Sequence, residues 1–400
     1  MRYENAVIPL RAAWSSPFLR WQGPAADVSS LDLAHQVTAR ALEERGVEWP
    51  VEELVLGLTV PQKEAFYGAP TLAARLGFPG VSGPMIAQAC ATSVAAVHVA
   101  AASQSGSEQG ARLVVTTDRT SNGPHLVYPR SSGPGGTAES ENWVLDSFER
   151  DPGTGESMLS TAERVAAEGG FTKEQLDELT LRRYEQYEQA IADDRAFQRR
   201  WMVPLTVGSG RRATEIEADQ GVRPVTREGL AGLKAVLHDG VVSYGSQTHP
   251  ADGTAGMILT TGAQGRELGV DGPLAEVLSS GFSRVEPGTM PKAPVPAARA
   301  ALKDAGLEFS DVDVIKTHNP FVVNDLWFSR ETGVDADTMN PYGCSLIYGH
   351  PQGPTGARGI VELLHALEER GGGIGLFTGC AAGDTGAALV VRVASAADQA

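Results

Sequence analysis

Cys90 is the first residue of this sequence that suggests chemistry. It is one of three cysteines in 400 residues, and it stands at the head of the alanine-rich run "ACATSVAAVHVAAAS". A helix that starts at Thr92 or Ser93 would place the sulfur near its N-terminus, where backbone N–H groups and the helix dipole favour a thiolate. Taken alone, the stretch also fits an inert cysteine that packs as a small hydrophobic side chain.

Three further candidates lie in glycine- and proline-rich segments near the C-terminus. His318 stands in "KTHNPF", His350 in "GHPQGPTG" and Cys380 in "GLFTGCAAGDTG". Each could instead be structural, as a strand cap, a satisfied turn residue or a turn filler. As a set they supply a nucleophile with acid and base partners, on loops that a rigid scaffold positions. Cys344, next to the His350 loop, is interpreted as a packing residue.

The spacing of these residues excludes several other chemistries. A zinc site would have to gather Cys344, His350 and Cys380, whose spacings match none of the usual ligand pairs, so no metal is predicted. The sequence contains no Walker A loop, no G-x-S-x-G elbow and no H-E-x-x-H pair. The residues therefore favour thiol chemistry assisted by histidine.

Composition narrows the class of protein. The net charge of −16 argues against nucleic-acid binding, because a polyanion would be repelled, although local arginines could hold a small anion. Three cysteines without a C-x-x-C pair suit a reducing compartment. The sequence shows no signal peptide, no run near the roughly 18 apolar residues of a membrane span and no peroxisomal C-terminus. We expect a soluble cytoplasmic protein that binds neither nucleic acid nor membrane.

Alternating strands and helices must position these side chains. Short apolar runs predict buried strands at residues 54–60, 111–117, 256–262, 312–318, 373–379 and 387–393. Capping residues and glycine stops predict helices at residues 29–46, 172–196 and 357–370. This order predicts a layered α/β fold, and a loose similarity between its halves suggests a duplicated α/β unit. The Gly-, Pro- and Ser-rich stretch 118–160 is interpreted as a long functional excursion.

Ordered motifs give the chain a resemblance to the thiolase family over nearly its whole length. "ACATSVAAVHVAAAS" resembles the family's nucleophile segment, and "GHPQGPTGARG" is similar to G-H-P-x-G-x-[ST]-G. "GCAAGDTGAALV" resembles C-x-G-G-G-x-G-x-A. The segments beginning "SMLSTAERVA" and "DGVVSYGSQTHPADGTAG" are similar to M-G-x-T-A-E-x-V-A and G-T-V-T-A-G-N-x-S-x-x-N-D-G-A-A. The resemblance implies the duplicated five-layer α/β/α/β/α thiolase fold with an inserted loop domain.

The resemblance also implies a role for each candidate. Cys90 would be the nucleophile that carries the acyl group as a thioester, with His350 activating it. Cys380 would be the acid/base at the α-carbon of acetyl-CoA. The backbone N–H groups of Cys90 and Ala382 would form one oxyanion hole, and His350 with a water held by His318 the other. Each such donor is worth about 3–4 kcal/mol in the transition state.

Coenzyme A would be a substrate and not a permanently bound cofactor. It would lie over a loop domain at 119–245, between one half made of 1–118 with 246–265 and another made of 266–400. Arg211 and Arg212 resemble basic residues near the adenine and phosphate, although a solvated surface pair is the alternative. Thr248 resembles a serine that meets the pantetheine amide. Met158 and Phe321 match pocket positions of the family.

The chain departs from the family pattern at three places. N-E-A-F becomes His318-Asn319-Pro320-Phe321, so histidine stands where asparagine commonly holds the water. Some branches, including the sterol-carrier-type enzymes, also have histidine there. Asp384 occupies a usual glycine of the C-x-G-G-G loop, and Ser157 replaces the histidine that often precedes the pocket methionine.

The implied function is that of a 3-ketoacyl-CoA thiolase or acetyl-CoA acetyltransferase of fatty acid metabolism. It would cleave 3-ketoacyl-CoA thiolytically, or condense acyl-CoA, through an acyl-cysteine intermediate. A homodimer is expected because the strand before Cys90 usually pairs across a two-fold axis; the unusual excursion leaves tetramer formation open. The alternatives are a ketoacyl synthase or HMG-CoA synthase type of enzyme, which lacks the second cysteine, and a non-catalytic thiolase-like subunit or lipid-binding protein.

Overall fold

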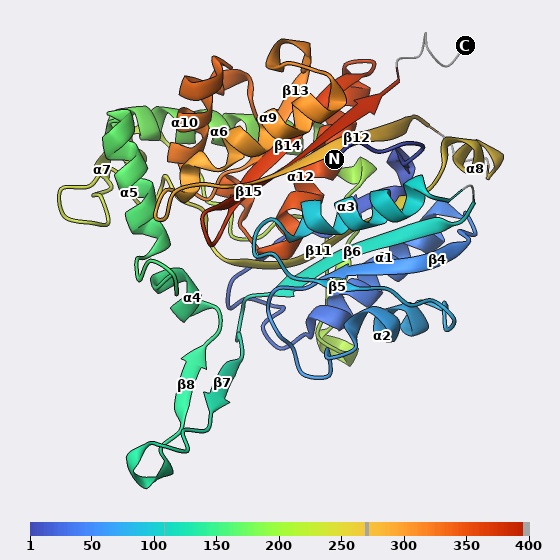
Figure 1. Ribbon diagram of the computed structural model, residues 1–400, viewed down its shortest axis with the longest axis horizontal. Coiled ribbons are helices and arrows are strands. Elements are labelled where there is room, and N and C mark those ends of the chain that lie inside the picture. The colour runs from blue at the N-terminus through green and yellow to red at the C-terminus, as the bar shows by residue number, and fades with distance from the viewer. Residues whose placement is uncertain (108, 269–271, 395–400) are drawn as a thin grey trace.

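Two β-sheets organise the chain, as the ribbon drawing of the computed structural model shows (Figure 1). The structure describes residues 1–107, 109–268 and 272–394. The first sheet runs in the order β2 (Ala13–Ser15), β11 (Ala251–Leu259), β6 (Ala111–Arg119), β4 (Val51–Gly57) and β5 (Met85–Ile86), and β3 (Leu19–Arg20) also pairs with β11. The second runs in the order β1 (Val7–Pro9), β12 (Leu274–Arg284), β15 (Thr385–Val393), β14 (Gly373–Ala381) and β13 (Val314–His318).

The two sheets repeat one succession of strand directions. Across the first sheet, β4 pairs parallel with β6, β6 antiparallel with β11, and β11 antiparallel with β2. Across the second, β13 pairs parallel with β14, β14 antiparallel with β15, and β15 antiparallel with β12. The duplicated α/β unit expected from the sequence is therefore present in the backbone.

Helices separate the two sheets and cover their outer faces. The helices α3 (Thr92–Ser105) and α12 (Gly353–Glu369) contact each other and lie between the sheets, because each contacts strands of both. The helices α1 (Ser30–Arg45) and α2 (Gly68–Arg75) pack on the other face of the first sheet, and α9 (Pro294–Ala305) packs on the second. The layers therefore follow the order α/β/α/β/α (Figure 1).

The two central helices are rich in apolar and small residues, and the buried charges of α12 are paired, as for Arg358 and Glu362 at 3.0 Å. Every residue of α12 from Gly353 to Leu367 is buried. Close packing of α12 on β14 requires a glycine, since a Cβ on Gly359 would lie 2.5 Å from the ring of Phe377. This packing fixes the N-terminal ends of both helices, which carry the candidate site.

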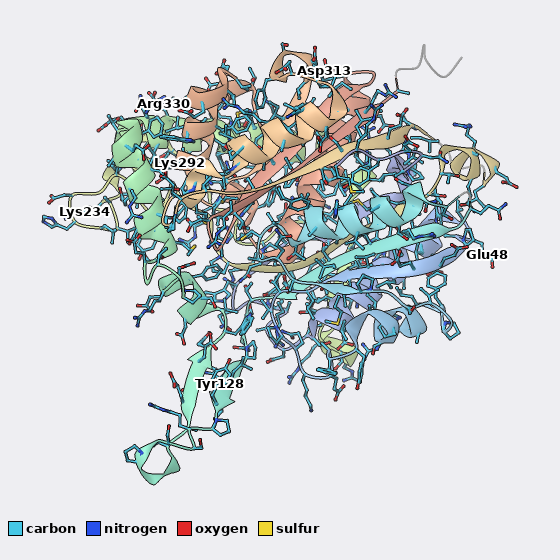
Figure 2. The ribbon with its side chains drawn as sticks, viewed as in Figure 1. Glu48, Tyr128, Lys234, Lys292, Asp313 and Arg330 are labelled. Carbon is cyan, nitrogen blue, oxygen red and sulfur yellow. The ribbon has the colours of Figure 1, made fainter. Side chains whose placement is uncertain are left out.

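The segment between β6 and β11 forms the region that the sequence predicted as a loop domain. It contains a projecting hairpin, a set of helices and a small sheet, whose elements are β7 (His125–Tyr128), β8 (Glu139–Asn142), α4 (Leu145–Glu149), α5 (Met158–Gly169), α6 (Lys173–Arg195), β9 (Leu205–Val207), β10 (Thr214–Ile216) and α7 (Arg227–Gly232). Tyr128 is exposed at the end of β7 on this hairpin (Figure 2). Within the described residues, no helix has the length and apolar character needed to cross a membrane.

Some element bounds differ from those that the sequence predicts. The helix predicted over 172–196 has the expected capping box of Thr172 and Gln175, but its backbone leaves helical geometry at Ala192. Asp193 and Asp194 then adopt positive φ, which aspartate tolerates better than most residues. The strand predicted at 256–262 lies at Ala251–Leu259, because its polar start is also buried within the sheet.

Candidate active site

The N-terminal ends of the two central helices meet at the candidate nucleophile. Cys90 precedes α3 and His350 precedes α12 in the chain. The Cys90 Sγ lies 3.1 Å from the His350 Nε2. Both helices therefore turn their free N–H groups and positive dipole ends toward one sulfur.

A strained turn presents Cys90. Ala89, directly before it, has a φ of 44°, which is unusual for a residue with a side chain. The Thr92 hydroxyl holds this turn: it donates to the Ala89 carbonyl at 2.7 Å and accepts from the Gln88 N–H at 2.8 Å. Cys90 is half-buried, so one side of its sulfur remains open to a cleft.

His350 is fixed through its second ring nitrogen. Its Nδ1 lies 2.6 Å from the Thr355 Oγ1, and its backbone N–H donates to the His249 carbonyl at 2.8 Å. These two contacts hold the ring so that Nε2 faces the Cys90 sulfur. Burial lowers the pKa of His350 well below its usual value, with His318 and His249 adding to the effect. The imidazole is therefore neutral and able to accept a proton.

His318, at the end of β13, lies directly against His350. The two rings stack with centroids 4.1 Å apart and planes inclined by 28°. The His318 Nδ1 contacts the Ser345 Oγ at 3.0 Å, whereas Nε2 has no hydrogen-bond partner within the described residues. Burial lowers the pKa of His318 to about 3. A neutral, buried imidazole with a free nitrogen suits the predicted role of holding a water or a substrate oxygen.

Cys380, at the end of β14, and the turn after it complete the site. The Asn324 Nδ2 donates to the Cys380 Sγ at 3.1 Å. Burial raises the pKa of the Cys380 thiol, and the nearby Cys90 adds to that rise. In the turn, Asp384 accepts from the Gly288 and Thr289 N–H groups at 3.0 Å each, which explains a carboxylate at a usual glycine position.

The Cys90 thiol is protonated in the resting site. Burial raises its pKa to about 12, while backbone N–H groups of Ala382 and of Cys90 itself donate to the sulfur and lower it. These two N–H groups are the ones that the family resemblance predicts for an oxyanion hole. The resting pair is thus a neutral thiol beside a neutral imidazole, ready for proton transfer as a carbonyl approaches.

A cleft of about 240 Å³ opens onto this constellation. Its lining includes six residues that the sequence predicted for the site: Cys90, Met158, Thr248, Phe321, His350 and Ala382. Phe148 of α4 and Leu159 of α5 contribute apolar walls from the loop segment. The cleft thus combines apolar walls with the candidate nucleophile Cys90, an arrangement that suits an acyl chain.

Comparison with known proteins identifies the family. The model of the thiolase N-terminal domain matches residues 10–263, and that of the thiolase C-terminal domain matches residues 272–393. The chain belongs to the thiolase family. An acetyl-CoA acetyltransferase of Rhizobium meliloti is 30% identical over 90% of this chain and 93% of its own. A beta-ketoadipyl-CoA thiolase of Pseudomonas putida is 30% identical over 94% and 97% of the two chains.

Solved thiolase structures share the whole fold. The acetyl-CoA acetyltransferase of Bacillus anthracis superposes with a TM-score of 0.90 at 29% identity, covering 98% of this chain and 100% of the other. Human mitochondrial 3-ketoacyl-CoA thiolase in complex with CoA superposes with a TM-score of 0.89 at 24% identity, covering 98% and 99%. The fold and the acyltransferase class predicted from the sequence are thereby confirmed.

A second cleft of this thiolase contains residues that the sequence did not point to. It measures about 340 Å³, shares Gln247 with the first, and is lined by Arg223, Tyr244 and His249 among others. Arg211 and Arg212, the predicted CoA contacts, lie on an exposed turn and line neither cleft. The only sequence signal for Arg223 was one arginine beside a proline, in "GVRPVT".

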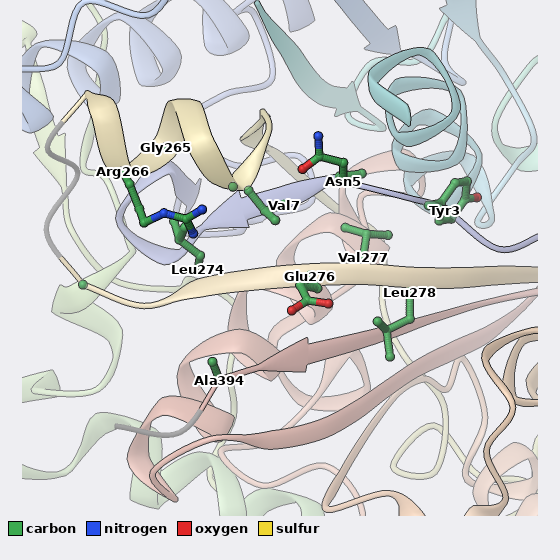
Figure 3. A pocket seen from close by; sticks show the side chains of 13 residues that line it. Tyr3, Asn5, Val7, Gly265, Arg266, Leu274, Glu276, Val277, Leu278 and Ala394 are labelled. Atoms are coloured by element: carbon green, nitrogen blue, oxygen red, sulfur yellow. The ribbon is translucent and has the colours of Figure 1, made fainter. Parts of the chain in front are cut away.

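A third cleft of the thiolase is remote from the nucleophile. It measures about 690 Å³ and lies between β1, β12 and the short helix α8 (Gly262–Glu267), as Figure 3 shows. Among the described residues, the charged side chains that line it are Arg266 and Glu276, and no cysteine or histidine does. Glu276 is already paired with Arg392 at 2.5 Å. This cleft therefore offers no nucleophile.

Proposed function

We propose that Cys90, His350 and Cys380 carry out the thiolase reaction, with the acyl group held on Cys90. The observation that carries the proposal is the contact of 3.1 Å between Cys90 Sγ and His350 Nε2, at a cleft into which Ala382 also faces. The reaction is the reversible thiolytic cleavage of 3-ketoacyl-CoA, or in the other direction the condensation of acyl-CoA.

In the first half of cleavage, the Cys90 sulfur attacks the keto carbon while His350 Nε2 takes the thiol proton. The bond between the keto carbon and the α-carbon then breaks, leaving an acyl-cysteine and the enolate of a shorter acyl-CoA. Cys380 gives its proton to the enolate carbon and becomes a thiolate. The N–H groups of Cys90 and Ala382 stabilise the negative oxygen at the attacked carbon, each by about 3–4 kcal/mol.

The second half returns every group to its starting state. The thiol of free coenzyme A gives its proton to the Cys380 thiolate and attacks the acyl-cysteine. The bond between the acyl carbon and Cys90 breaks, and the released Cys90 thiolate recovers its proton from His350. Condensation follows the same steps backwards, with Cys380 removing a proton from the α-carbon of acetyl-CoA. A ping-pong scheme follows, since the first product leaves before coenzyme A enters.

We place coenzyme A, as a substrate, across the two adjoining clefts. The pantetheine arm would pass Met158, Thr248 and Phe321 in the first cleft. The adenosine phosphate end would reach the second cleft, where the exposed Arg223 supplies a cation on an otherwise acidic protein. Gln247 belongs to both clefts, which supports one continuous path. Arg211 and Arg212 would then act only on groups beyond the clefts.

We further infer a cytoplasmic homodimer that works in acyl-CoA metabolism such as that of fatty acids. All three cysteines are free, which suits a reducing compartment. The strand β5 forms one edge of the first sheet, four residues before Cys90, and exposed apolar side chains lie near it. Such an edge favours pairing with a second copy.

Mass spectrometry after incubation with acetyl-CoA tests the nucleophile. We expect one acetyl group on Cys90 in the folded protein, none in Cys90→Ala, and a normal adduct in the matched control Cys344→Ala, whose cysteine is buried away from the cleft. Absence of the adduct from the folded wild-type protein would contradict the covalent mechanism.

The same assay separates the two cysteines. Cys380→Ser should still form the adduct on Cys90 but lose cleavage of acetoacetyl-CoA, because only the carbon–carbon step needs the second thiol. Full turnover in Cys380→Ser would show that Cys380 is not the acid/base.

A further inference from the structure

Asn324 is a buried amide whose side chain meets the second cysteine. It lies in the first turn of α10 (Val322–Thr332) and is 2% exposed. Its Nδ2 donates to the Cys380 Sγ at 3.1 Å, and its Oδ1 has no hydrogen-bond partner within the described residues. A buried amide with an unpaired oxygen costs free energy. Packing alone therefore does not explain this side chain.

The neighbouring residue anchors the first turn of α10. The Asp325 carboxylate accepts from Arg183 of α6 at 2.9 Å, from the Thr317 hydroxyl at 2.7 Å and from the Asn319 amide at 2.6 Å. All of these groups are buried, and the side chains of the Arg183–Asp325 pair are 0% and 1% exposed. The amide of Asn324 is thus held in place relative to β13 and β14.

The reaction requires Cys380 to exist as a thiolate between the two half-reactions. Burial disfavours that charge, and Cys90 and Asp325 oppose it further, whereas the hydrogen bonds from Asn324 and from the backbone N–H of Cys380 itself favour it. The N-terminal end of α10 lies on the same side and contributes its positive dipole. Hydrogen bonds to a charged acceptor are stronger than neutral ones. The hydrogen bond from the Asn324 amide to the Cys380 sulfur therefore strengthens when the thiolate forms.

We propose that Asn324 is a positioning residue of the carbon–carbon step, stabilising the Cys380 thiolate and aiming it at the α-carbon of the acyl-CoA. The inference rests on the acid/base role of Cys380 proposed above. It differs from that proposal because it concerns only the second cysteine: Asn324 does not contact Cys90 or His350 by any hydrogen bond among the described residues.

Other titratable groups lie around Cys380 and also influence how its thiol titrates. They are Cys90 at the start of α3, His318 on the neighbouring strand β13, Asp325 on α10 and Asp384 in the turn after β14. None of them donates a hydrogen bond to the Cys380 sulfur in the described structure. Among the described residues, Asn324 is therefore the side-chain donor to this sulfur, beside the backbone N–H of Cys380 itself.

Exchange of the α-protons of acetyl-CoA isolates the step that needs Cys380. Trideuterated acetyl-CoA incubated with the enzyme in ordinary water loses deuterium when a base removes an α-deuteron and a proton from water replaces it. In Asn324→Leu, which keeps the branched shape but removes the donor, we expect exchange near neutral pH to fall about tenfold. Its pH–rate profile should move upward by about one pH unit, since one unit corresponds to a tenfold change. Acetylation of Cys90 should stay within about twofold.

Two more variants test whether the effect comes from the donor at Asn324. Asn324→Asp is nearly isosteric and turns a carboxylate toward the sulfur, so its profile should move further upward than that of Asn324→Leu. Gln104→Leu is the matched control: it removes another buried amide, at the far end of α3, and should leave the profile unchanged.

The outcomes distinguish this inference from the proposed function. If Cys380→Ser abolishes exchange but both Asn324 variants keep the wild-type profile, the inference is overturned and the acid/base role stands. Equal loss of Cys90 acetylation and of exchange in both variants also overturns it, because the effect would then be general disruption. If Cys380→Ser itself exchanges normally, the acid/base role falls instead.

Discussion

The two stacked histidines show how the site divides its tasks at the scale of single residues. The His350 ring has partners on both nitrogens, Thr355 on Nδ1 and Cys90 on Nε2, so it is oriented for one proton transfer. Among the residues that the structure describes, the His318 ring has a partner on Nδ1 alone, which leaves its Nε2 for a ligand or a water. The histidine that departs from the family's usual asparagine therefore keeps a free polar atom at the expected place.

The low pKa of His318 predicts that the folded protein loses stability in acid. In the unfolded chain this imidazole would bind a proton near pH 6.5, whereas burial lowers its pKa in the folded state to about 3. Below pH 6.5 the unfolded state thus binds more protons, and stability is lost as the pH falls toward 3. In His318→Asn, the decrease in unfolding free energy between pH 7 and pH 4.5 should be smaller by about 2–3 kcal/mol. Urea unfolding at both pH values measures this.

A surface histidine serves as the control for that measurement. His238 is 94% exposed, so His238→Asn should lose as much stability in acid as the wild type. An equal loss in His318→Asn and the wild type would show that His318 is not kept neutral by burial.

At the scale of elements, Asp118 joins both halves of the molecule. Its carboxylate, at the end of β6, accepts from the Thr59 and Val60 N–H groups after β4 at 2.9 Å each. It also accepts at 2.8 Å from the N–H of Gly353, the first residue of α12. A Cβ on Gly353 would lie 2.6 Å from this carboxylate. One side chain of the first half thus sets where the helix after His350 begins.

Asp118→Asn should weaken the site through this helix. Burial raises the pKa of Asp118 to about 7, and the donors from Val60, Thr59 and Gly353 oppose that rise. An amide cannot accept at both ends, so at least one buried N–H group would lose its acceptor. We expect the free energy of unfolding to fall by about 1–3 kcal/mol, with slower acetylation of Cys90. Denaturant unfolding and the acetyl adduct measure the two effects.

Glu163→Gln is the matched control for this substitution. The Glu163 carboxylate also accepts backbone N–H groups, from Val241 and Val242, but in the loop segment away from α12. It should lose stability without slowing acetylation. If Asp118→Asn acetylated at the wild-type rate, Asp118 would support the fold but not the position of His350.

The sequence predicted those elements that depend on residues close together in the chain. Cys90, His350 and Cys380 stand in motifs that retain their spacing, and the apolar runs gave β6, β14 and β15 nearly in place. Patterns along the chain could not show that β1 leaves the first half to pair with β12, because that pairing depends on residues far apart.

The CoA contacts illustrate the same limit. Arg211 and Arg212 stand out in the sequence as adjacent charges and remain a prediction, whereas the arginine that lines the second cleft in the described structure is Arg223. Which arginine faces a cleft depends on how the loop segment packs on the second half. The role of Asn324 was hidden for the same reason, since its partner Cys380 lies 56 residues away.

At the scale of the whole molecule, the site draws on all three parts of the chain. The first half supplies Cys90, the second supplies His350 and Cys380, and the loop segment supplies Met158 and other walls of the cleft. Buried ion pairs fasten the loop segment to the second half, namely Arg183 with Asp325 at 2.9 Å and Arg358 with Asp219 at 2.5 Å. Removing one partner of such a pair is costly, so the walls of the cleft are held firmly.

The free edge of the first sheet predicts the assembly. The strand β5 pairs with β4 on one side, and near it Phe66 is 85%, Tyr67 69% and Met85 39% exposed. If this edge joins two copies, light scattering on a sizing column should show a dimer. The double variant Phe66→Asp with Met85→Asp should then be monomeric. Acetylation of Cys90 should slow in the monomers, because the turn that presents the sulfur follows β5 directly. Val127→Asp, on the projecting hairpin, should leave the dimer intact and would remove only a tetramer. A wild-type monomer, or a double variant that stays dimeric, would contradict pairing through β5.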